Sequence, residues 1–166
     1  KSERVEGLIP EIAKLSKLCD ELKITKLAFA DCHTMASPEF DAYPAHCVEG
    51  TVEWEIVDEL KDIGGYTLIP KNSTNGFLED KFQKWLKENE RINTFIITGD
   101  CTDICILQFA TTLKTWFNMQ NRRSKIIVPL NAVETYELGV HDGDLMHVMA
   151  LYNMMLNGID VVAEVK

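Results

Sequence analysis

The segment that decides the fold runs Phe95-Ile96-Ile97-Thr98-Gly99-Asp100-Cys101-Thr102-Asp103-Ile104-Cys105. After the apolar run and the glycine, apolar residues recur at intervals of three and four, at Ile104, Leu107, Ala110, Leu113 and Phe117. This order predicts a strand, a tight turn and an amphipathic helix. Cys105 then lies in the first turn of the helix, where free backbone N–H groups and the helix dipole favour a thiolate and lower the pKa. Cys105 is a candidate nucleophile; the alternative is a small buried apolar residue.

The segments on either side alternate between strand and helix patterns. Apolar runs predict strands over 26–30, 66–69, 125–128 and 159–162, and helical spacing predicts helices over 5–22, 52–60, 78–87 and 144–156. Such alternation predicts an α/β fold of three layers, with a central, mostly parallel sheet between two layers of helices. The aperiodic segment from Asp31 to Gly50 is expected to be a long functional loop.

Composition narrows the class of protein. The 166 residues, 46% of them hydrophobic, predict a single domain over 1–166. A net charge of −9 argues against nucleic acid and anionic membranes as partners, which leaves a small-molecule substrate and is compatible with a homo-oligomer. Five cysteines without paired CxxC spacing favour a reducing compartment over a disulfide framework. No signal peptide or transmembrane run is evident, so we expect a cytoplasmic protein.

Polar residues follow three of the predicted strands directly. They are Asp31, Lys71 and the turn that leads to Cys105. Because parallel strands present their carboxyl ends at one edge of the sheet, where ligands bind, we expect these residues to lie together. Lys71 would then favour a thiolate at Cys105 by charge attraction. The alternative is a solvated surface lysine.

A possible metal site lies in the loop after the first of these strands. Asp31-x-His33, followed by His46, offers a carboxylate and two imidazoles, a ligand set that suits zinc, iron or manganese. Glu39 could add a fourth ligand. The alternative is that Asp31 caps a turn and that both histidines are surface residues. The two remaining histidines, His141 and His147, receive no role from the sequence.

These residues carry a family resemblance. Residues 43–51, Tyr-Pro-Ala-His-Cys-Val-Glu-Gly-Thr, resemble the aromatic-Pro-x-His-Cys-Val-x-Gly-Thr segment of nicotinamidases. Residues 97–105 resemble the nucleophile turn of the isochorismatase-like cysteine hydrolases, 31–33 match the Asp-x-His metal pair of that family, and 71–77 resemble its lysine segment. Four motifs in the right order are specific, and the similarity extends from about Leu8 to Val162.

The resemblance implies a role for each matching residue. Cys105 would be the nucleophile and Lys71 the lysine of the catalytic triad. The metal ligands would be Asp31, His33, His46 and, as in some members, Glu39. The backbone N–H groups of Cys101 and Cys105 would form the oxyanion hole, with a cis peptide bond before Cys101. Tyr43 and Phe77 would line the substrate pocket.

The sequence departs from the family pattern in two places. The family's triad aspartate lies on a strand upstream of the first helix, whereas this chain begins at Lys1, beside that helix. We therefore expect a preceding strand that carries the aspartate; the alternative is a degenerate member of the family. Tyr43 and Thr74 stand where nicotinamidases commonly have tryptophan and tyrosine, so the resemblance identifies the substrate less closely than the reaction.

The function implied is hydrolysis of nicotinamide to nicotinate and ammonia through a thioester, with zinc the first choice of metal. One alternative is a metal-free hydrolase of the same fold that acts on another small amide or ureide, or an isochorismatase. Another is a non-catalytic binding or scaffold protein.

Overall fold

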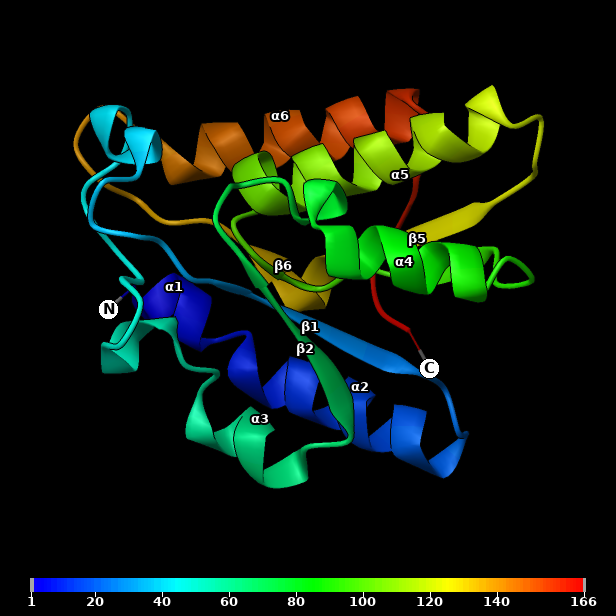
Figure 1. Ribbon diagram of the computed structural model, residues 1–166. Coiled ribbons are helices and arrows are strands. Elements are labelled where there is room, and N and C mark those ends of the chain that lie inside the picture. The colour runs from blue at the N-terminus through cyan, green and yellow to red at the C-terminus, as the bar shows by residue number, and fades with distance from the viewer. Residues whose placement is uncertain (1, 166) are drawn as a thin grey trace.

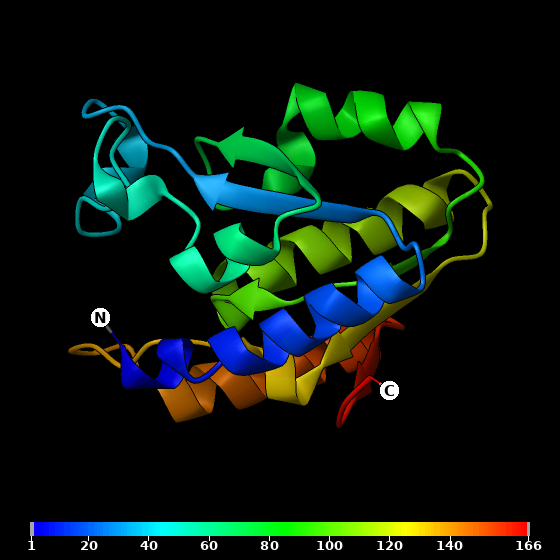
Figure 2. The same ribbon diagram turned by 90° about the horizontal axis from the view of Figure 1, so that it is seen from below.

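The computed structural model describes residues 2–165, and its strands lie between two layers of helices (Figure 1). The strands are β1 (Lys26–Asp31), β2 (Tyr66–Lys71), β3 (Thr94–Ile96), β4 (Gly99–Asp100), β5 (Lys125–Pro129), β6 (Val133–Glu134) and β7 (Asp160–Val162). The helices are α1 (Glu3–Glu6), α2 (Ile9–Glu21), α3 (Asp58–Ile63), α4 (Asp80–Glu88), α5 (Leu107–Met119) and α6 (Gly143–Leu156). Helices α4, α5 and α6 cover one face, and α1, α2 and α3 lie on the other (Figures 1 and 2). The predicted three-layer α/β fold is confirmed.

The strands form three hydrogen-bonded groups, and every ladder within them is parallel. The groups are β1–β2, β3–β5–β7 and β4–β6. Within residues 2–165 no ladder joins β1 to β3 or β4. The sheet is therefore divided beside β1 rather than continuous.

The hydrophobic core lies under α4 and α5. Phe77, in a 3-10 turn at Gly76–Leu78, is only 7% exposed, and its ring centroid lies 5.7 Å from that of Phe82 and 6.3 Å from that of Trp116. These contacts place Phe77 in the core, not in a substrate pocket as the resemblance implied. Gly76 makes room for this packing, because a Cβ there would lie 2.6 Å from Cδ1 of Phe29.

Two predicted helices have different bounds. The helix expected over 5–22 is interrupted between α1 and α2, because Pro10 at the start of α2 has no N–H with which to continue a preceding helix. The segment 52–60 forms a 3-10 turn over Val52–Trp54, and α3 begins only at Asp58. Gly64 and Gly65, with φ of 60° and 71°, then turn the chain into β2.

Two expectations from composition can also be compared with the structure. All five cysteines are free, as the absence of paired spacing predicts. Among residues 2–165, no helix is both long enough and apolar enough to cross a membrane.

Candidate active site

The β1–β2 ladder sets Asp31 beside Lys71. The two residues are register partners at the last position of the ladder. The Nζ atom of Lys71 donates to Oδ1 of Asp31 and to the carbonyl oxygen of Ser73 at 3.2 Å, and it lies 3.5 Å from Sγ of Cys105. The prediction that Asp31, Lys71 and Cys105 meet at one edge of the sheet is confirmed.

Cys105 lies in a π-helical turn, Thr102–Ile106, that leads into α5. The wider turn is closed by a hydrogen bond of 3.1 Å from the backbone N–H of Ile106 to the carbonyl oxygen of Cys101. The peptide bond between Asp100 and Cys101 is cis, as the resemblance implied. A hydrogen bond from the backbone of Cys101 reaches Cys105 and favours its thiolate. An amide expected in the oxyanion hole therefore lies beside the sulfur.

Burial and charge act in opposite directions on this cluster. Burial lowers the pKa of Lys71, but Cys105 and Asp31 outweigh it and the pKa lies above its ordinary value, so Lys71 is an ammonium. Burial also raises the pKa of Cys105, with Asp31 and Asp100 acting in the same direction and Lys71 against them. The net shift is upward. This direction is opposite to the lowered pKa expected from the helix terminus, because burial and the carboxylates of Asp31 and Asp100 outweigh Lys71 and the backbone hydrogen bond from Cys101.

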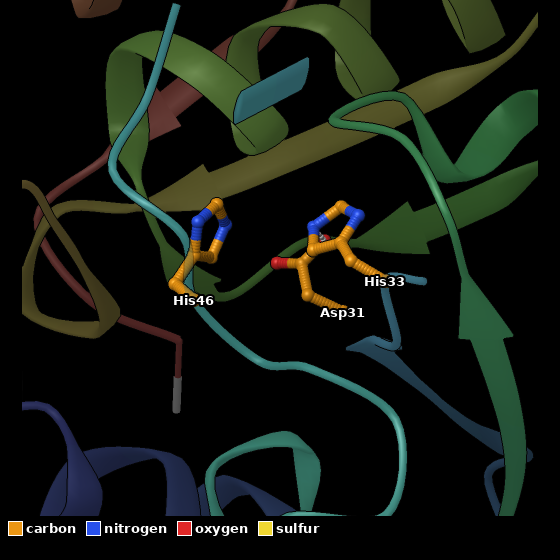
Figure 3. A group of neighbouring side chains, drawn as sticks. All are labelled: Asp31, His33 and His46. Atoms are coloured by element: carbon orange, nitrogen blue, oxygen red, sulfur yellow. Dashed lines mark ion pairs between the residues drawn. The ribbon is translucent and has the colours of Figure 1, made fainter. Parts of the chain in front are cut away.

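A second group of side chains stands beside Asp31. One ligand atom each from Asp31, His33 and His46 lies within 4.8 Å of the others, and Figure 3 shows the three side chains facing one another. His33 Nδ1 lies 3.2 Å from Oδ1 of Asn72, and His46 Nδ1 lies 2.8 Å from the carbonyl oxygen of Pro44. Both partners are acceptors, so each Nδ1 carries the proton and each Nε2 presents a lone pair.

The donor set fits a divalent metal ion. His33 is only 1% exposed, and its Nε2 is buried without a hydrogen-bond partner in the protein. A ligating histidine characteristically donates its other N–H to a carbonyl or carboxylate, as both rings do here. The unpartnered nitrogen, the second lone pair and the carboxylate are therefore the open ligand atoms of a site that can hold zinc or a similar ion.

The loop from 31 to 50 brings the two histidines together by closing on itself. The N–H of His33 donates to the carbonyl oxygen of Cys47 at 3.0 Å. The N–H of Glu49 donates to the carbonyl oxygen of His33 at 2.9 Å. These bonds form a short parallel bridge between His33 and Val48. The thiol of Cys47 donates to the carbonyl oxygen of Glu53 at 3.4 Å.

Two further predicted residues lie around this group. Glu39 approaches the Nδ1 side of His33, with 3.7 Å between Oε2 and that nitrogen, and accepts from the N–H of Thr74 at 3.0 Å. The structure therefore does not bring Glu39 into the ligand group but behind it. Burial raises the pKa of Tyr43, with further contributions from Glu39, Cys105 and Asp103. This coupling agrees with the predicted position of Tyr43 near the nucleophile.

The sequence did not single out a polar cluster around Asp103, two residues before Cys105. Asp103, in the π-helical turn, accepts hydrogen bonds from Thr135 Oγ1 at 2.6 Å and from His141 at 2.8 Å. The ring of Tyr136 stacks on that of His141, with centroids 4.1 Å apart. Phe40 was also missed; its ring centroid lies 5.5 Å from that of His33. For the cluster around Asp103, the only signal in the sequence was His141 itself, which lies in a segment without helical or strand periodicity.

Comparisons with known proteins agree with this geometry. The isochorismatase domain model matches residues 1–161. Nicotinamidase 1 of Arabidopsis thaliana is 30% identical over 192 residues, which cover 99% of this chain and 76% of that protein.

Two solved structures share the fold. The pyrazinamidase of Pyrococcus horikoshii in complex with zinc has a TM-score of 0.76 and 22% identity, over 95% of this chain and 86% of that one. The N-carbamoylsarcosine amidase of Thermoplasma acidophilum has a TM-score of 0.78 and 19% identity, over 98% and 85%. The chain therefore belongs to the isochorismatase family and is a hydrolase that acts on amide C–N bonds of small molecules.

Proposed function

We propose that this enzyme hydrolyses nicotinamide to nicotinate and ammonia through a thioester on Cys105. The contact that supports this most directly is that of Lys71, whose Nζ touches both Asp31 and the sulfur of Cys105. The similarity to a plant nicotinamidase over 99% of the chain supports the choice of substrate.

The residues divide the chemistry between them. Sγ of Cys105 forms a bond to the amide carbon, and its proton passes to an aspartate that would fill the place of the family's triad aspartate. The backbone N–H groups of Cys101 and Cys105 hold the oxygen of the tetrahedral intermediate. The C–N bond breaks as the aspartate returns the proton to nitrogen, and ammonia leaves. Water then cleaves the thioester, with the same aspartate accepting its proton.

Lys71 supplies the charge that the thiol needs. Burial and two neighbouring carboxylates keep Cys105 protonated, so attack requires both a base and a cation beside the developing thiolate. The Lys71 ammonium lies 3.5 Å from the sulfur and is held there by Asp31. Lys71 thus lowers the free energy of the charged sulfur at the moment of attack.

Asp31, His33 and His46 would hold the metal, with zinc the first candidate. A bound zinc ion would take the pyridine nitrogen of the substrate and ordered water, and so orient the ring toward Cys105. The zinc in the Pyrococcus horikoshii pyrazinamidase and the unpartnered Nε2 of His33 support this assignment. The ring of Phe40, against both imidazoles, would exclude bulk water from one side.

The test measures ammonia release from nicotinamide by the full-length natural protein. Cys105→Ala should abolish turnover and leave metal content unchanged. Cys101→Ala is the matched control, because it keeps the backbone N–H and should retain most of the activity. Iodoacetamide should label Cys105 first, because burial and Asp100 raise the pKa of Cys101 to about 12. Turnover by Cys105→Ala, or faster labelling of Cys101, would contradict the assignment.

Hydrolysis of another small amide or ureide is the second candidate. Thr74 stands where nicotinamidases commonly have tyrosine, and its hydroxyl donates to Gln108 at 3.0 Å. A substrate panel separates the candidates: kcat/KM highest for nicotinamide supports the first, and kcat/KM highest for a ureide such as N-carbamoylsarcosine supports the second.

A further inference from the structure

Both ring nitrogens of His141 lie within hydrogen-bond distance of oxygen atoms. Its Nε2 lies 2.8 Å from Oδ2 of Asp103, and its Nδ1 lies 2.9 Å from the carbonyl oxygen of Tyr136. A carbonyl oxygen can only accept, and so can an ionised carboxylate. A neutral imidazole carries one proton and can satisfy only one of these partners.

Asp103 is the anion of this pair. Its side chain is only 3% exposed, and its second oxygen accepts a hydrogen bond of 2.6 Å from Thr135 Oγ1. A carboxylate taken out of water in this way requires a cation or several donors. The donors present are the Thr135 hydroxyl and His141, and together they hold both carboxylate oxygens.

We propose that His141 is a positioning residue of the active site, which as an imidazolium ties the loop over 135–142 to the π-helical turn that presents Cys101 and Cys105. Its bond to Asp103 holds the same turn whose Cys105 sulfur lies against Lys71. Thr135, which bonds Asp103, also contacts the Cys101 thiol, so one loop holds two positions of the turn. The link to catalysis rests on the proposed function; the protonation state does not.

The same loop places an aromatic ring near the site. Tyr136 stacks on His141 at 4.1 Å with an interplanar angle of 16°. Burial raises the pKa of Tyr136, and Cys101, Asp103 and Tyr43 add to the shift. Because the Tyr136 ring stacks on His141, the hydrogen bonds of the protonated imidazole also fix the position of that ring.

The groups around His141 decide the direction of its titration. Burial lowers its pKa, but Asp103 from the turn, and the Tyr136 carbonyl and Glu137 from its own loop, raise it above the ordinary value. Below that pKa both hydrogen bonds form. Above it the ring gives up one of them, so the loop and the turn loosen as the pH rises.

His147 provides a matched control. Its side chain is 17% exposed, like that of His141, and it also contacts the turn, with 2.9 Å between Nδ1 and Oγ1 of Thr102. A hydroxyl can donate as well as accept, so this contact does not require a charged ring. His147 Nδ1 also lies 3.4 Å from Oε1 of Glu134, a carboxylate outside the Asp103 cluster. A variant at 147 therefore removes a histidine that contacts the same turn without removing the proposed imidazolium at 141.

The first experiment measures protonation alone. In the full-length holoenzyme at pH 7, nitrogen NMR should show both ring nitrogens of His141 protonated. Asp103→Asn should lower the pKa of His141 in the same spectra, because the anion is removed. A single protonated nitrogen at pH 7, or an unchanged pKa in Asp103→Asn, overturns the proposal, whatever substrate the enzyme has.

The second experiment tests positioning. His141→Gln keeps a donor but cannot be charged, and we expect kcat to fall about tenfold with KM within about twofold, as for loss of one charge-assisted hydrogen bond. The iodoacetamide rate of Cys105 against pH should show an inflection at the pKa of His141 that disappears in His141→Gln and remains in His147→Gln. An inflection that survives in His141→Gln overturns the positioning role. Because labelling needs no substrate, this result is independent of whether nicotinamide is turned over.

Discussion

The structure holds two histidine clusters, one around Asp31 and one around Asp103, and they differ in the atom that the second ring nitrogen contacts. In His33 and His46 one nitrogen donates to a carbonyl oxygen and the other carries a lone pair toward Asp31. In His141 both nitrogens donate, one to a carbonyl oxygen and one to Asp103. Aspartate paired with histidine thus gives two results. Around Asp31 the neutral imidazoles leave a site that can bind a cation, whereas beside Asp103 the His141 imidazolium is itself the cation.

The largest difference between the clusters should appear when a ring is removed. His46→Ala deletes one of three ligands, and we expect the affinity for zinc to fall by more than about 100-fold, since even partners behind the ligands contribute about 10- to 100-fold. Competition with a chelator and elemental analysis measure this. His141→Ala is the control and should keep its metal. Equal metal content in both variants would remove the distinction.

A substitution at Gly143 tests the cluster around His141 separately from the cluster around Asp31. A Cβ at this position would lie 2.7 Å from the carbonyl oxygen of Tyr136, which accepts from His141. Gly143→Ala should therefore displace that acceptor and lower the free energy of unfolding by about 1 to 3 kcal/mol, as overpacking does. Urea denaturation gives the value. Metal affinity should be unchanged; a loss of zinc would show that the two clusters are not independent.

The side-chain oxygen of Asn72 contacts Nδ1 of His33, just as the Tyr136 carbonyl oxygen contacts Nδ1 of His141. It accepts the Nδ1 proton of His33 at 3.2 Å and so directs the Nε2 lone pair toward the site. Asn72→Ala should weaken zinc binding by about tenfold, less than loss of a ligand. Isothermal titration with zinc would measure it. Unchanged affinity would mean that packing alone orients the ring.

The smallest expected effect is on stability against pH. The pKa of His141 is raised by folding, so its contribution to stability is complete below the unfolded value of about 6.5 and is lost as the pH rises through the folded value. The difference in unfolding free energy between the wild-type protein and His141→Gln should therefore shrink from pH 6 upward. A difference that grows with pH would indicate a neutral ring in the folded state.

The rule that ligands bind at the carboxyl ends of parallel strands predicted where Asp31 and Lys71 lie. Asp31 and Lys71 each close an apolar run, and parallel strands bring such residues together without further information. The positions of His33 and His46 followed from the same segment, because the loop that separates them is local. The sequence thus predicted the residues at this edge, although the pKa of Cys105 depends on burial that no spacing reveals.

The second cluster could not be predicted in the same way. Asp103 and His141 are separated by 38 positions, and they meet through β4 and β6, which have two residues each and so no period to detect. The prediction that Phe77 lines the substrate pocket was wrong for a related reason. An aromatic residue beside a motif is compatible with a core position and with a pocket position until its neighbours in the fold are known. The apolar spacing after Cys105 was also compatible with either a π-helical or an α-helical turn.

The register of the ladder between β1 and β2 determines what happens when these strands pair incorrectly during folding. Its last pair, Asp31 with Lys71, holds the metal carboxylate and the lysine that touches Cys105. Slipping one of the two strands by a single residue would turn its own side chain to the opposite face of the sheet and so separate Asp31 from Lys71. A slip of β1 would remove the candidate metal carboxylate and the anchor of Lys71, and a slip of β2 would remove the lysine that touches Cys105. Either mispaired protein should be fully inactive rather than partly active or altered in specificity.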